Sequence, residues 1–217
     1  MLNYLFQFFH ERDHLLTMFD KDVTLLDRQI KNQCAPKPSY EVIAPLTCSS
    51  YFGAFSEQSE LHFFATGQRQ WLIDLKAEQI ETGLKAQAYF ESRCAKAFEQ
   101  FRQTEIAQHA QNVGCEKLTS LSKQRRDETW RHFLDGTYGV CTTDGLPETI
   151  VLKQTLVSTI DRFLQRQQKK NNDVELESLL KVVNALDQVE PPFAPHERLR
   201  SSRQRCIVNV RATYLKS

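Results

Sequence analysis

Apolar residues repeat every three or four positions over most of this chain, which is the spacing of helices that bury one face. Three short helices are predicted in the first ~35 residues, followed by one long or once-broken helix over residues 71–113. Later helices are predicted to begin near Thr129, Pro147, Leu176 and Pro195, the last running to about residue 215. Residues 40–43 and 61–64 fit two short strands that can pair, within an otherwise irregular stretch over 44–70.

The predicted fold is therefore mainly α. A helix-turn-helix-like N-terminal subdomain with a minimal β element is expected over residues 1–70, packed on a larger helical body over residues 71–217. Only 7 glycines and 7 prolines are present, too few for the many turns of a β-sandwich or barrel. The length of 217 residues suits one domain with an appended subdomain.

Charge and the length of apolar runs bear on the partners of the chain. Lys and Arg total 28 against 27 Asp and Glu, so the net charge of +1 creates no overall field toward nucleic acid or an anionic membrane. No run reaches the ~18 uncharged residues of a membrane-spanning helix, and the apolar start lacks a basic signal-peptide region. The six cysteines include no C-x-x-C pair. We expect a cytoplasmic protein with reduced thiols and no membrane segment, and the sequence leaves the oligomeric state open.

The segment from His10 to His14 matches the H-E-x-x-H pattern of zinc proteases. Two histidines four apart on a helix can share a zinc ion while the glutamate acts as base. Here the intervening Arg12 and Asp13 are both charged, whereas a buried metal-binding helix needs apolar residues to pack, and no third ligand follows nearby in the sequence. We therefore interpret the match as chance on a solvated helix face, and predict no metal and no cofactor.

The N-terminal helices and the two strands resemble a winged-helix DNA reader, with a support helix over 15–19 and a recognition helix over 24–32. A DNA reader presents unopposed Lys and Arg side chains to phosphates. Within residues 11–37 the basic residues Arg12, Lys21, Arg28, Lys31 and Lys37 are matched by five acidic ones. This balance argues against specific nucleic-acid binding, and the same arrangement of helices also occurs as a plain packing unit.

The most glycine-dense stretch, residues 136–145, precedes the helix predicted at Pro147. Cys141 is a candidate nucleophile, because a thiol near a helix N-terminus can have its pKa lowered. Tyr138 is a candidate acid or base, and Thr142 is a candidate ligand-binding residue, since the glycines would let a ligand approach the backbone. For Cys141 taken alone, a plain turn around a buried, unreactive thiol is the favoured alternative.

A second dense patch follows Pro195. If Pro195 opens a helix, His196, Arg200 and Arg203 lie on one side near its N-terminus and can bind a carboxylate or phosphate. Glu197 would orient His196 or an arginine, and His196 is the third catalytic candidate. The alternative is a surface helix whose arginines pair with carboxylates on neighbouring helices.

A family resemblance rests on segments spread over nearly the whole chain. These segments are Tyr4-Leu5 with Leu15-Leu16, Pro36-Lys37-Pro38-Ser39-Tyr40-Glu41-Val42, Gly136-Thr137-Tyr138-Gly139-Val140-Cys141, and Pro192-Phe193-Ala194-Pro195-His196-Glu197 with Ser201-Ser202-Arg203. In them the chain resembles an uncharacterised bacterial family catalogued as natural-product biosynthesis proteins. The resemblance implies a place in such a pathway, and it brings no established activity and no catalytic residue with it.

Three functions stay open at this point. The leading hypothesis is an accessory or small-molecule-binding protein of a cytoplasmic biosynthetic pathway. Its anionic ligand would lie between the loop over residues 136–145 and the start of the Pro195 helix. We expect residues 138–141 of that loop and the helix start to meet in space and line one pocket. The alternatives are a winged-helix DNA-binding regulator and an adaptor that binds other proteins through helical faces.

Overall fold

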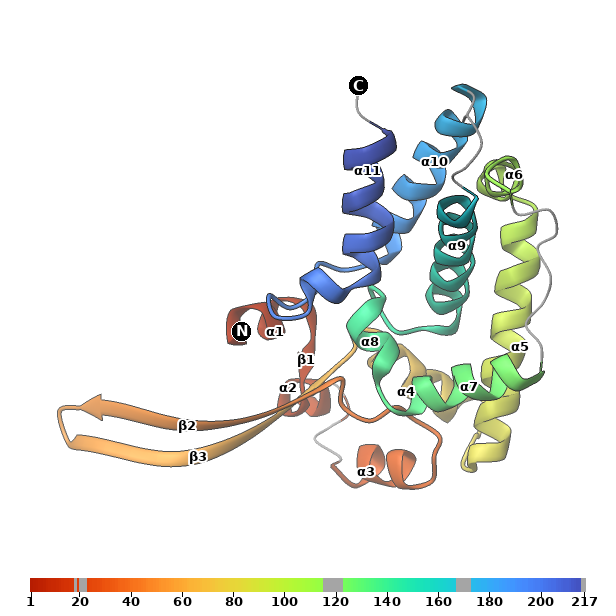
Figure 1. The fold of residues 1–217 in the computed structure, drawn as a ribbon. Helices are drawn as coiled ribbons and strands as arrows, with labels where there is room; N and C mark the ends of the chain where they lie inside the picture. The colour runs from red at the N-terminus through yellow and green to blue at the C-terminus, as the bar shows by residue number, and fades with distance from the viewer. Residues whose placement is uncertain (18, 20–22, 115–122, 167–172, 216–217) are drawn as a thin grey trace.

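The computed structural model describes residues 1–17, 19, 23–114, 123–166 and 173–215. These residues form a mainly helical molecule with one small three-stranded antiparallel sheet, which confirms the predicted fold class to that extent (Figure 1). Within the described ranges no helix is long and apolar enough to cross a membrane. Asp20, Lys21 and Asp22, which enter the charge balance of residues 11–37, lie outside these ranges.

The N-terminal elements combine short helices with the whole sheet. In chain order they are α1 (Leu2–Phe8), β1 (His10–Glu11), α2 (Arg12–Thr17), α3 (Val23–Lys31), β2 (Tyr40–Ser50) and β3 (Gly53–Phe64). The strands are antiparallel and lie in the order β1-β3-β2. β1 pairs only with the last two residues of β3, so the sheet is three strands wide only at the base of the β2–β3 hairpin.

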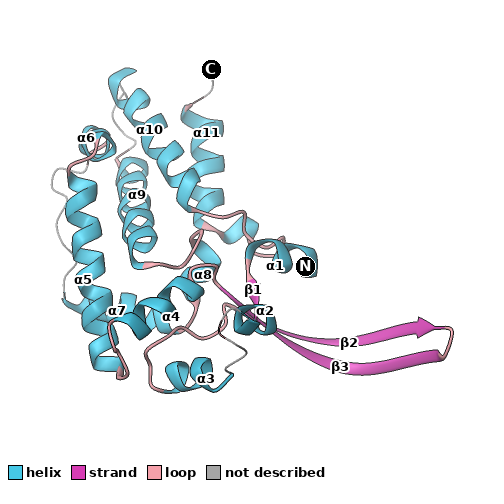
Figure 2. Cartoon of the chain, turned by 180° about the vertical axis from the view of Figure 1, so that it is seen from behind, coloured by secondary structure: helices cyan, strands magenta, loops and turns pink. Residues whose placement is uncertain are grey.

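The β2–β3 hairpin extends away from the rest of the molecule (Figures 1 and 2). The predicted pairing of 40–43 with 61–64 is confirmed, but the expectation of irregular chain between them is wrong, because the pairing continues out to Ser50 and Gly53. Pro45 is compatible with this strand because β2 lies at the edge of the sheet, where outward-pointing N–H groups have no strand to pair with. Gly53 follows the turn at φ +117°, a conformation that favours glycine.

The helical body follows the hairpin. Its helices are α4 (Gln68–Ala77), α5 (Gly83–Arg102), α6 (Glu105–Asn112), α7 (Lys123–Leu134), α8 (Thr137–Cys141), α9 (Pro147–Gln165), α10 (Asp173–Val189) and α11 (Asn209–Tyr214). α9 packs between α5 and α10, and α11 packs on α10 (Figure 1). Pro147 occupies the start of α9 as predicted, because its fixed φ and missing N–H suit the first turn of a helix.

The expected helix over residues 71–113 is divided into three. α4 and α5 are separated by a turn in which Gln79 has φ +53°, which a continuous helix does not permit. α6 starts anew at Thr104, whose hydroxyl accepts a hydrogen bond from the Ala107 N–H. The apolar spacing is therefore helical throughout, but it does not reveal these two interruptions.

The helix expected from Pro195 begins later than predicted. The residues after Pro195 form turns and a 3₁₀ turn (Arg198–Arg200), followed by a π-helical turn (Gln204–Val208) that leads into α11. Pro195 therefore does not stand at a helix N-terminus, and the anion-binding argument built on such a terminus is wrong for this segment.

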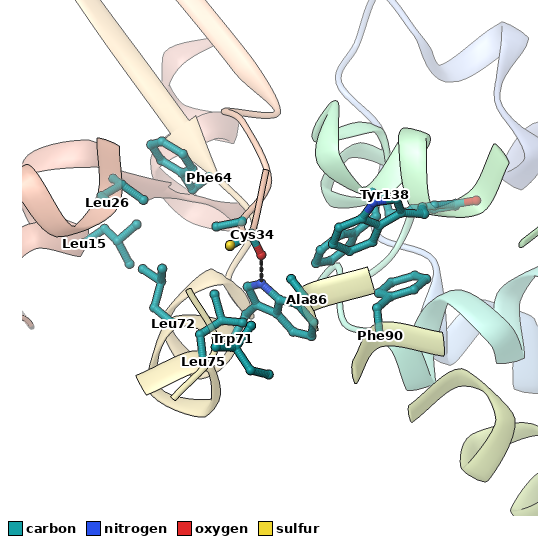
Figure 3. Packing of buried hydrophobic residues seen from close by; sticks show 14 of the residues in the cluster. Leu15, Leu26, Cys34, Phe64, Trp71, Leu72, Leu75, Ala86, Phe90 and Tyr138 are labelled. Carbon is teal, nitrogen blue, oxygen red and sulfur yellow. Dashed lines mark hydrogen bonds between the residues drawn. The ribbon is translucent and has the colours of Figure 1, made fainter. Parts of the chain in front are cut away.

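One hydrophobic cluster joins the N-terminal elements to the body across the expected boundary at residue 70 (Figure 3). It brings Leu15, Leu26 and Phe64 from the N-terminal elements together with Trp71 and Phe90 from the body. A second cluster fills the space between α6, α9, α10 and α11. A third packs α1 against the hairpin base, and Ala194 from the C-terminal part is buried with it.

Candidate functional site

The glycine-dense stretch is closed by contacts within the chain. Residues 137–141, expected as a loop, form the short helix α8, and Gly136 precedes it at φ +74°. A Cβ added to Gly136 would lie 2.7 Å from the Pro38 carbonyl oxygen, and one added to Gly139 would lie 2.1 Å from Ser39 Oγ. The glycines do permit a close approach, as predicted, but the group that approaches is the 37–39 segment of the same chain.

Tyr138 and Thr142 are engaged in the fold. The Tyr138 hydroxyl accepts a hydrogen bond of 2.6 Å from the Gln154 side chain, and burial raises its pKa to about 12. The Thr142 hydroxyl donates to the Tyr138 carbonyl oxygen at 2.7 Å and accepts from the Gly145 N–H at 2.9 Å. Both side chains are buried, and these hydrogen bonds hold the turn between α8 and α9 in place.

Cys141 is the last residue of α8 rather than a residue poised before α9. Burial raises the pKa of its thiol, and this effect outweighs the attraction of the Lys153 ammonium, which lowers it. A nucleophilic cysteine needs the opposite shift, because only the thiolate attacks. The structure therefore favours the alternative of a buried, unreactive thiol, which stays protonated at neutral pH.

The two dense patches approach each other at Glu190, which follows α10. The Glu190 side chain is fully buried, and it lies 3.6 Å from Lys153 Nζ and accepts a hydrogen bond from Ser202 Oγ. Arg203 donates to the Glu190 carbonyl oxygen at 2.9 Å and pairs with Asp187. The Thr143 N–H, just after Cys141, donates to the Val189 carbonyl oxygen at 3.0 Å. The patches thus converge on a buried ion pair.

Burial raises the pKa of Glu190, against the lowering effects of Ser202, Lys153 and Arg203. Its Oε2 atom is buried and receives no hydrogen bond from the described residues. Sequence reasoning overlooked Glu190 and Lys153, because nothing in their neighbours along the chain distinguishes them from surface residues. Only packing of α9 against α10 buries them together.

His196, Glu197 and Arg200 do not join this junction. His196 is 59% exposed and lies 3.7 Å from Glu197 Oε1, and Arg200 is exposed as well. Glu197 turns toward the N-terminal elements, where its Oε2 accepts a hydrogen bond of 2.6 Å from the Tyr40 hydroxyl. His196 is therefore solvent-exposed, and Glu197 anchors the base of the hairpin to the C-terminal part of the chain.

A space bordered by the glycine-dense stretch is too small for a metabolite. It lies where Gly136, Tyr138 and Gly145 face Trp71, and its volume of about 10 Å³ is room for about one water molecule. Neither His196 nor Arg203 lines it. Arg203 is committed to Asp187, which Arg211 also contacts at 2.8 Å, so the alternative of arginines paired with carboxylates describes this region. An anionic ligand stays a prediction.

The H-E-x-x-H match is divided between two elements. His10 and Glu11 form β1, and His14 lies on α2, so the two histidines do not share one helical face. Their ring centroids are 5.5 Å apart. Among the described residues no group of three or more His, Cys, Asp or Glu side chains is placed to hold a metal ion. The absence of a metal stays a prediction that elemental analysis can check.

The outer part of the hairpin carries a set of exposed apolar residues that the sequence reading missed. Directly opposite residues of a hairpin point to the same side. The pairs Ala44–Ser59, Leu46–Glu57 and Cys48–Phe55 therefore share a face with the pairs at the hairpin base, Tyr40–Phe63 and Val42–Leu61, which pack into the core. We call residues 44–59 the arm, and define the arm face as Ala44, Leu46, Cys48 and Phe55 with Tyr51 and Phe52 at the tip.

The large apolar side chains of the arm face are exposed to solvent, whereas such side chains are usually buried. Tyr51 is 96% exposed, Phe52 94%, Phe55 58% and Leu46 42%. The strands contain Glu41, Glu57 and Glu60, and residues 40–64 contain no Lys or Arg. Apolar residues alternate at Val42, Ala44, Leu46 and Cys48, and this period of two is typical of a strand. Pro45 and Gly53 instead favoured the prediction of irregular chain.

A family model described as a family of unknown function, DUF6058, matches residues 86–215. The chain belongs to this family. No curated protein and no solved structure matches the chain. The DUF6058 match begins inside α5 and reaches the residue after α11, so it includes the junction at Glu190 and leaves out the N-terminal elements and the arm.

The segments that carried the family resemblance lie at the joint between the N-terminal elements and the DUF6058 body. The Lys37 N–H donates to the Leu134 carbonyl oxygen at 2.9 Å, and Ser39 Oγ donates to the Gly136 carbonyl oxygen at 2.9 Å. Ala194 is buried beside Leu5 of α1. These contacts explain the motifs as structural: they fix the base of the hairpin on the helical body.

Proposed function

We propose that this protein is an interaction protein that binds a protein partner through its arm, with the helical body holding the arm in place. The arm face carries the proposal, because it exposes three aromatic side chains at the end of a hairpin that extends from the body. Contiguous exposed apolar surface typically marks a contact site for another macromolecule. Aromatic residues are enriched at the centres of protein–protein interfaces.

The way the hairpin is attached supports this proposal. Its base is held by the Tyr40–Glu197 hydrogen bond of 2.6 Å and by Ser39, whose Oγ donates to the Gly136 carbonyl oxygen at 2.9 Å. Phe63 and Phe64 at the end of β3 are buried. A hairpin with a firmly packed base presents its outer residues in a defined direction, which lowers the entropic cost of binding.

The order of the N-terminal elements is a helix, a strand, two helices and a hairpin, with the first strand beside the last, and this order resembles that of a winged-helix unit. A winged helix that reads DNA presents Lys and Arg side chains to the phosphates from its hairpin and from its recognition helix, which here would be α3. Residues 40–64 contain no Lys or Arg. α3 carries Arg28 and Lys31 beside Asp27, which pairs with Arg12 at 2.8 Å. These charges favour a protein partner over DNA.

An interaction protein also fits the accessory role in natural-product biosynthesis that the family resemblance implies, since such a protein can bring pathway components together without catalysing a step. That pathway and a bacterial origin stay predictions that rest on the motifs. The family itself is described only as one of unknown function. Deleting the gene and profiling metabolites of the producing cells would test the pathway.

A site-specific photo-crosslinker tests the proposed function directly. Phe52, at the tip of the arm, is replaced by a photoreactive phenylalanine analogue in the full chain, and cells that produce it are irradiated. We expect protein adducts at Phe52. The matched control places the same analogue at Leu84 of α5, which is 82% exposed and lies away from the arm, and should give few adducts.

Two outcomes would contradict the proposal. Adducts at Phe52 with nucleic acid would favour the winged-helix regulator. Protein adducts no more frequent at Phe52 than at Leu84 would show that the arm face has no protein partner in the cell.

A further inference from the structure

We infer that the partner of the arm face is a second copy of this chain, which binds through its own arm face in a symmetric dimer. This inference rests on the proposed function, because it names the protein partner of the same surface. Three properties of the arm carry it: the alternation of large and small side chains, the distribution of charge, and the area of apolar surface.

The first property is shape. Along the arm face the pair Ala44–Ser59 consists of two small side chains, between the larger pairs Val42–Leu61 and Leu46–Glu57. A face with a row of small side chains next to rows of large ones can interdigitate with an identical face turned by 180°, as the inner faces of two stacked sheets do. Leu46 and Phe55 are large side chains of the kind that fits over the row of small ones.

The second property is charge. Glu57 is the one charged residue on the arm face, while Glu41 and Glu60 point to the opposite side of the hairpin. Two copies packed through their arm faces would keep Glu41 and Glu60 in solvent. A strongly basic partner would instead have to contact the opposite side, which has fewer exposed apolar groups. Apart from Glu57, the arm face is uncharged, and it therefore matches another copy of itself.

The third property is area. Aromatic side chains bury about 150–250 Å² each when covered, so Tyr51, Phe52 and Phe55 with Leu46 offer about 500 Å² per chain. Two copies together reach about 1,000 Å², the lower bound for a specific interface, which predicts a weak, reversible dimer. A two-stranded hairpin is marginally stable alone in water, whereas two packed hairpins give four strands around a shared apolar layer.

The position of the arm permits this pairing. In both views the hairpin reaches beyond every other described element, so two arms can meet without collision between the helical bodies (Figures 1 and 2). A two-fold axis between the arms closes the assembly at two chains, because each arm face is used once.

Sedimentation equilibrium of the full chain, from about 1 to about 200 µM, tests the inference, since a weak interface of this size is expected to dissociate in the micromolar range. We expect a monomer–dimer equilibrium that Leu46→Arg and Phe55→Arg each weaken at least tenfold. The matched controls are Thr47→Arg and Ser56→Arg. Thr47 and Ser56 are a cross-strand pair on the opposite face of the hairpin, and each directly follows one of the two test residues in the sequence. Their substitutions therefore add the same charge to the same part of the arm, but should leave the equilibrium unchanged. Circular dichroism checks that all four variants remain folded.

Cys48 provides a second measurement that needs no substitution. It is an exposed thiol on the arm face, so its rate of alkylation should fall several-fold between about 1 and about 200 µM protein as dimerisation covers it. A chain that remains monomeric at the highest concentration overturns the inference. So does a dimer that the arm-face variants leave intact, or a dimer in which Cys48 alkylation does not slow.

The two proposals can fail separately. If the purified chain is monomeric while Phe52 crosslinks to another protein in cells, the dimer is wrong and the interaction function stands. If the chain is monomeric and Phe52 gives no protein adducts, both are wrong.

Discussion

The indole N–H of Trp71 donates a hydrogen bond of 2.8 Å to the backbone carbonyl oxygen of Cys34 (Figure 3). Trp71 belongs to α4 of the helical body, and Cys34 follows α3 of the N-terminal elements. Both are buried in the same cluster, and the Trp71 ring packs edge-on against Phe133 with centroids 4.9 Å apart. One side chain therefore joins the two parts of the molecule by packing and by a polar contact.

Replacing Trp71 with Phe removes this hydrogen bond and leaves the Cys34 carbonyl oxygen buried without its donor. We expect a loss of unfolding free energy of about 3 kcal/mol, from the lost ring area and the unsatisfied acceptor together. Urea unfolding at 25 °C, followed by far-UV circular dichroism, measures it. Trp130→Phe is the control, because Trp130 is buried in the same cluster and does not bond Cys34. Equal losses in the two variants would show that the hydrogen bond contributes nothing.

Lys153→Met leaves the buried Glu190 carboxylate without its cation, 3.6 Å away in the native protein. Breaking a buried pair by removing one partner costs about 3 kcal/mol, whereas replacing both partners costs much less. We therefore expect Lys153→Met to destabilise strongly, and the double variant Lys153→Met with Glu190→Gln to recover most of the loss. Urea unfolding of the wild type, both single variants and the double variant at pH 7.5 gives the coupling. Additive losses would mean that the two side chains act independently.

The same pair predicts a pH dependence. Burial raises the folded-state pKa of Glu190 above the ordinary glutamate value of 4.5, and Lys153 opposes that rise. Without Lys153 the pKa rises further, so the folded protein binds the proton more tightly than the unfolded chain does. The stability of Lys153→Met should therefore be closest to wild type near pH 4.5 and fall behind as pH rises through the raised pKa. A deficit that grows toward acid pH would contradict this assignment, and the double variant should show no such trend.

Gly136→Ala tests the close approach of the 37–39 segment to α8. The new methyl group would lie 2.7 Å from the Pro38 carbonyl oxygen and 2.8 Å from the Lys37 carbonyl oxygen, at a residue with φ +74°. We expect a loss of about 2–4 kcal/mol, of which the backbone conformation alone accounts for about 1–2 kcal/mol. Gly53→Ala is the control, because Gly53 also has positive φ but has no atom within 4 Å of the added Cβ. Thermal unfolding that shifts equally in both variants would show that the contact with residues 37–38 adds no cost.

Binding to DNA is predicted to be weak and insensitive to sequence. Arg12 pairs with Asp27 on α3, and the hairpin brings no Lys or Arg toward phosphates. Fluorescence anisotropy at physiological salt, with duplexes from the promoter of its own gene and from a scrambled sequence, should give dissociation constants weaker than about 10⁻⁶ M for both. A constant near 10⁻⁸ M for the promoter alone would support the winged-helix regulator in place of the protein-binding arm.

The sequence by itself determined the mainly helical class, the start of α9 at Pro147 and the pairing of 40–43 with 61–64. These features follow from local chemistry: helical spacing of apolar residues, the fixed φ of proline, and short β-branched and aromatic runs. The glycines of residues 136–145 also indicated a close approach to the backbone. Except for the pairing itself, each of these conclusions needs only residues near one another in the chain.

Only the tertiary structure decided what approaches Gly136, which way the Cys141 pKa shifts, and where the exposed apolar surface lies. Each depends on segments distant in sequence: the Pro38 carbonyl oxygen lies against Gly136, and burial at the α8–α9 junction overrides any helix-terminus effect on Cys141. The sequence did not predict the arm, because Pro45 and Gly53 each indicate the end of a strand when only their neighbours in the chain are considered. Pro45 is tolerated only because β2 is the edge strand, and the order of strands in a sheet is set by long-range pairing.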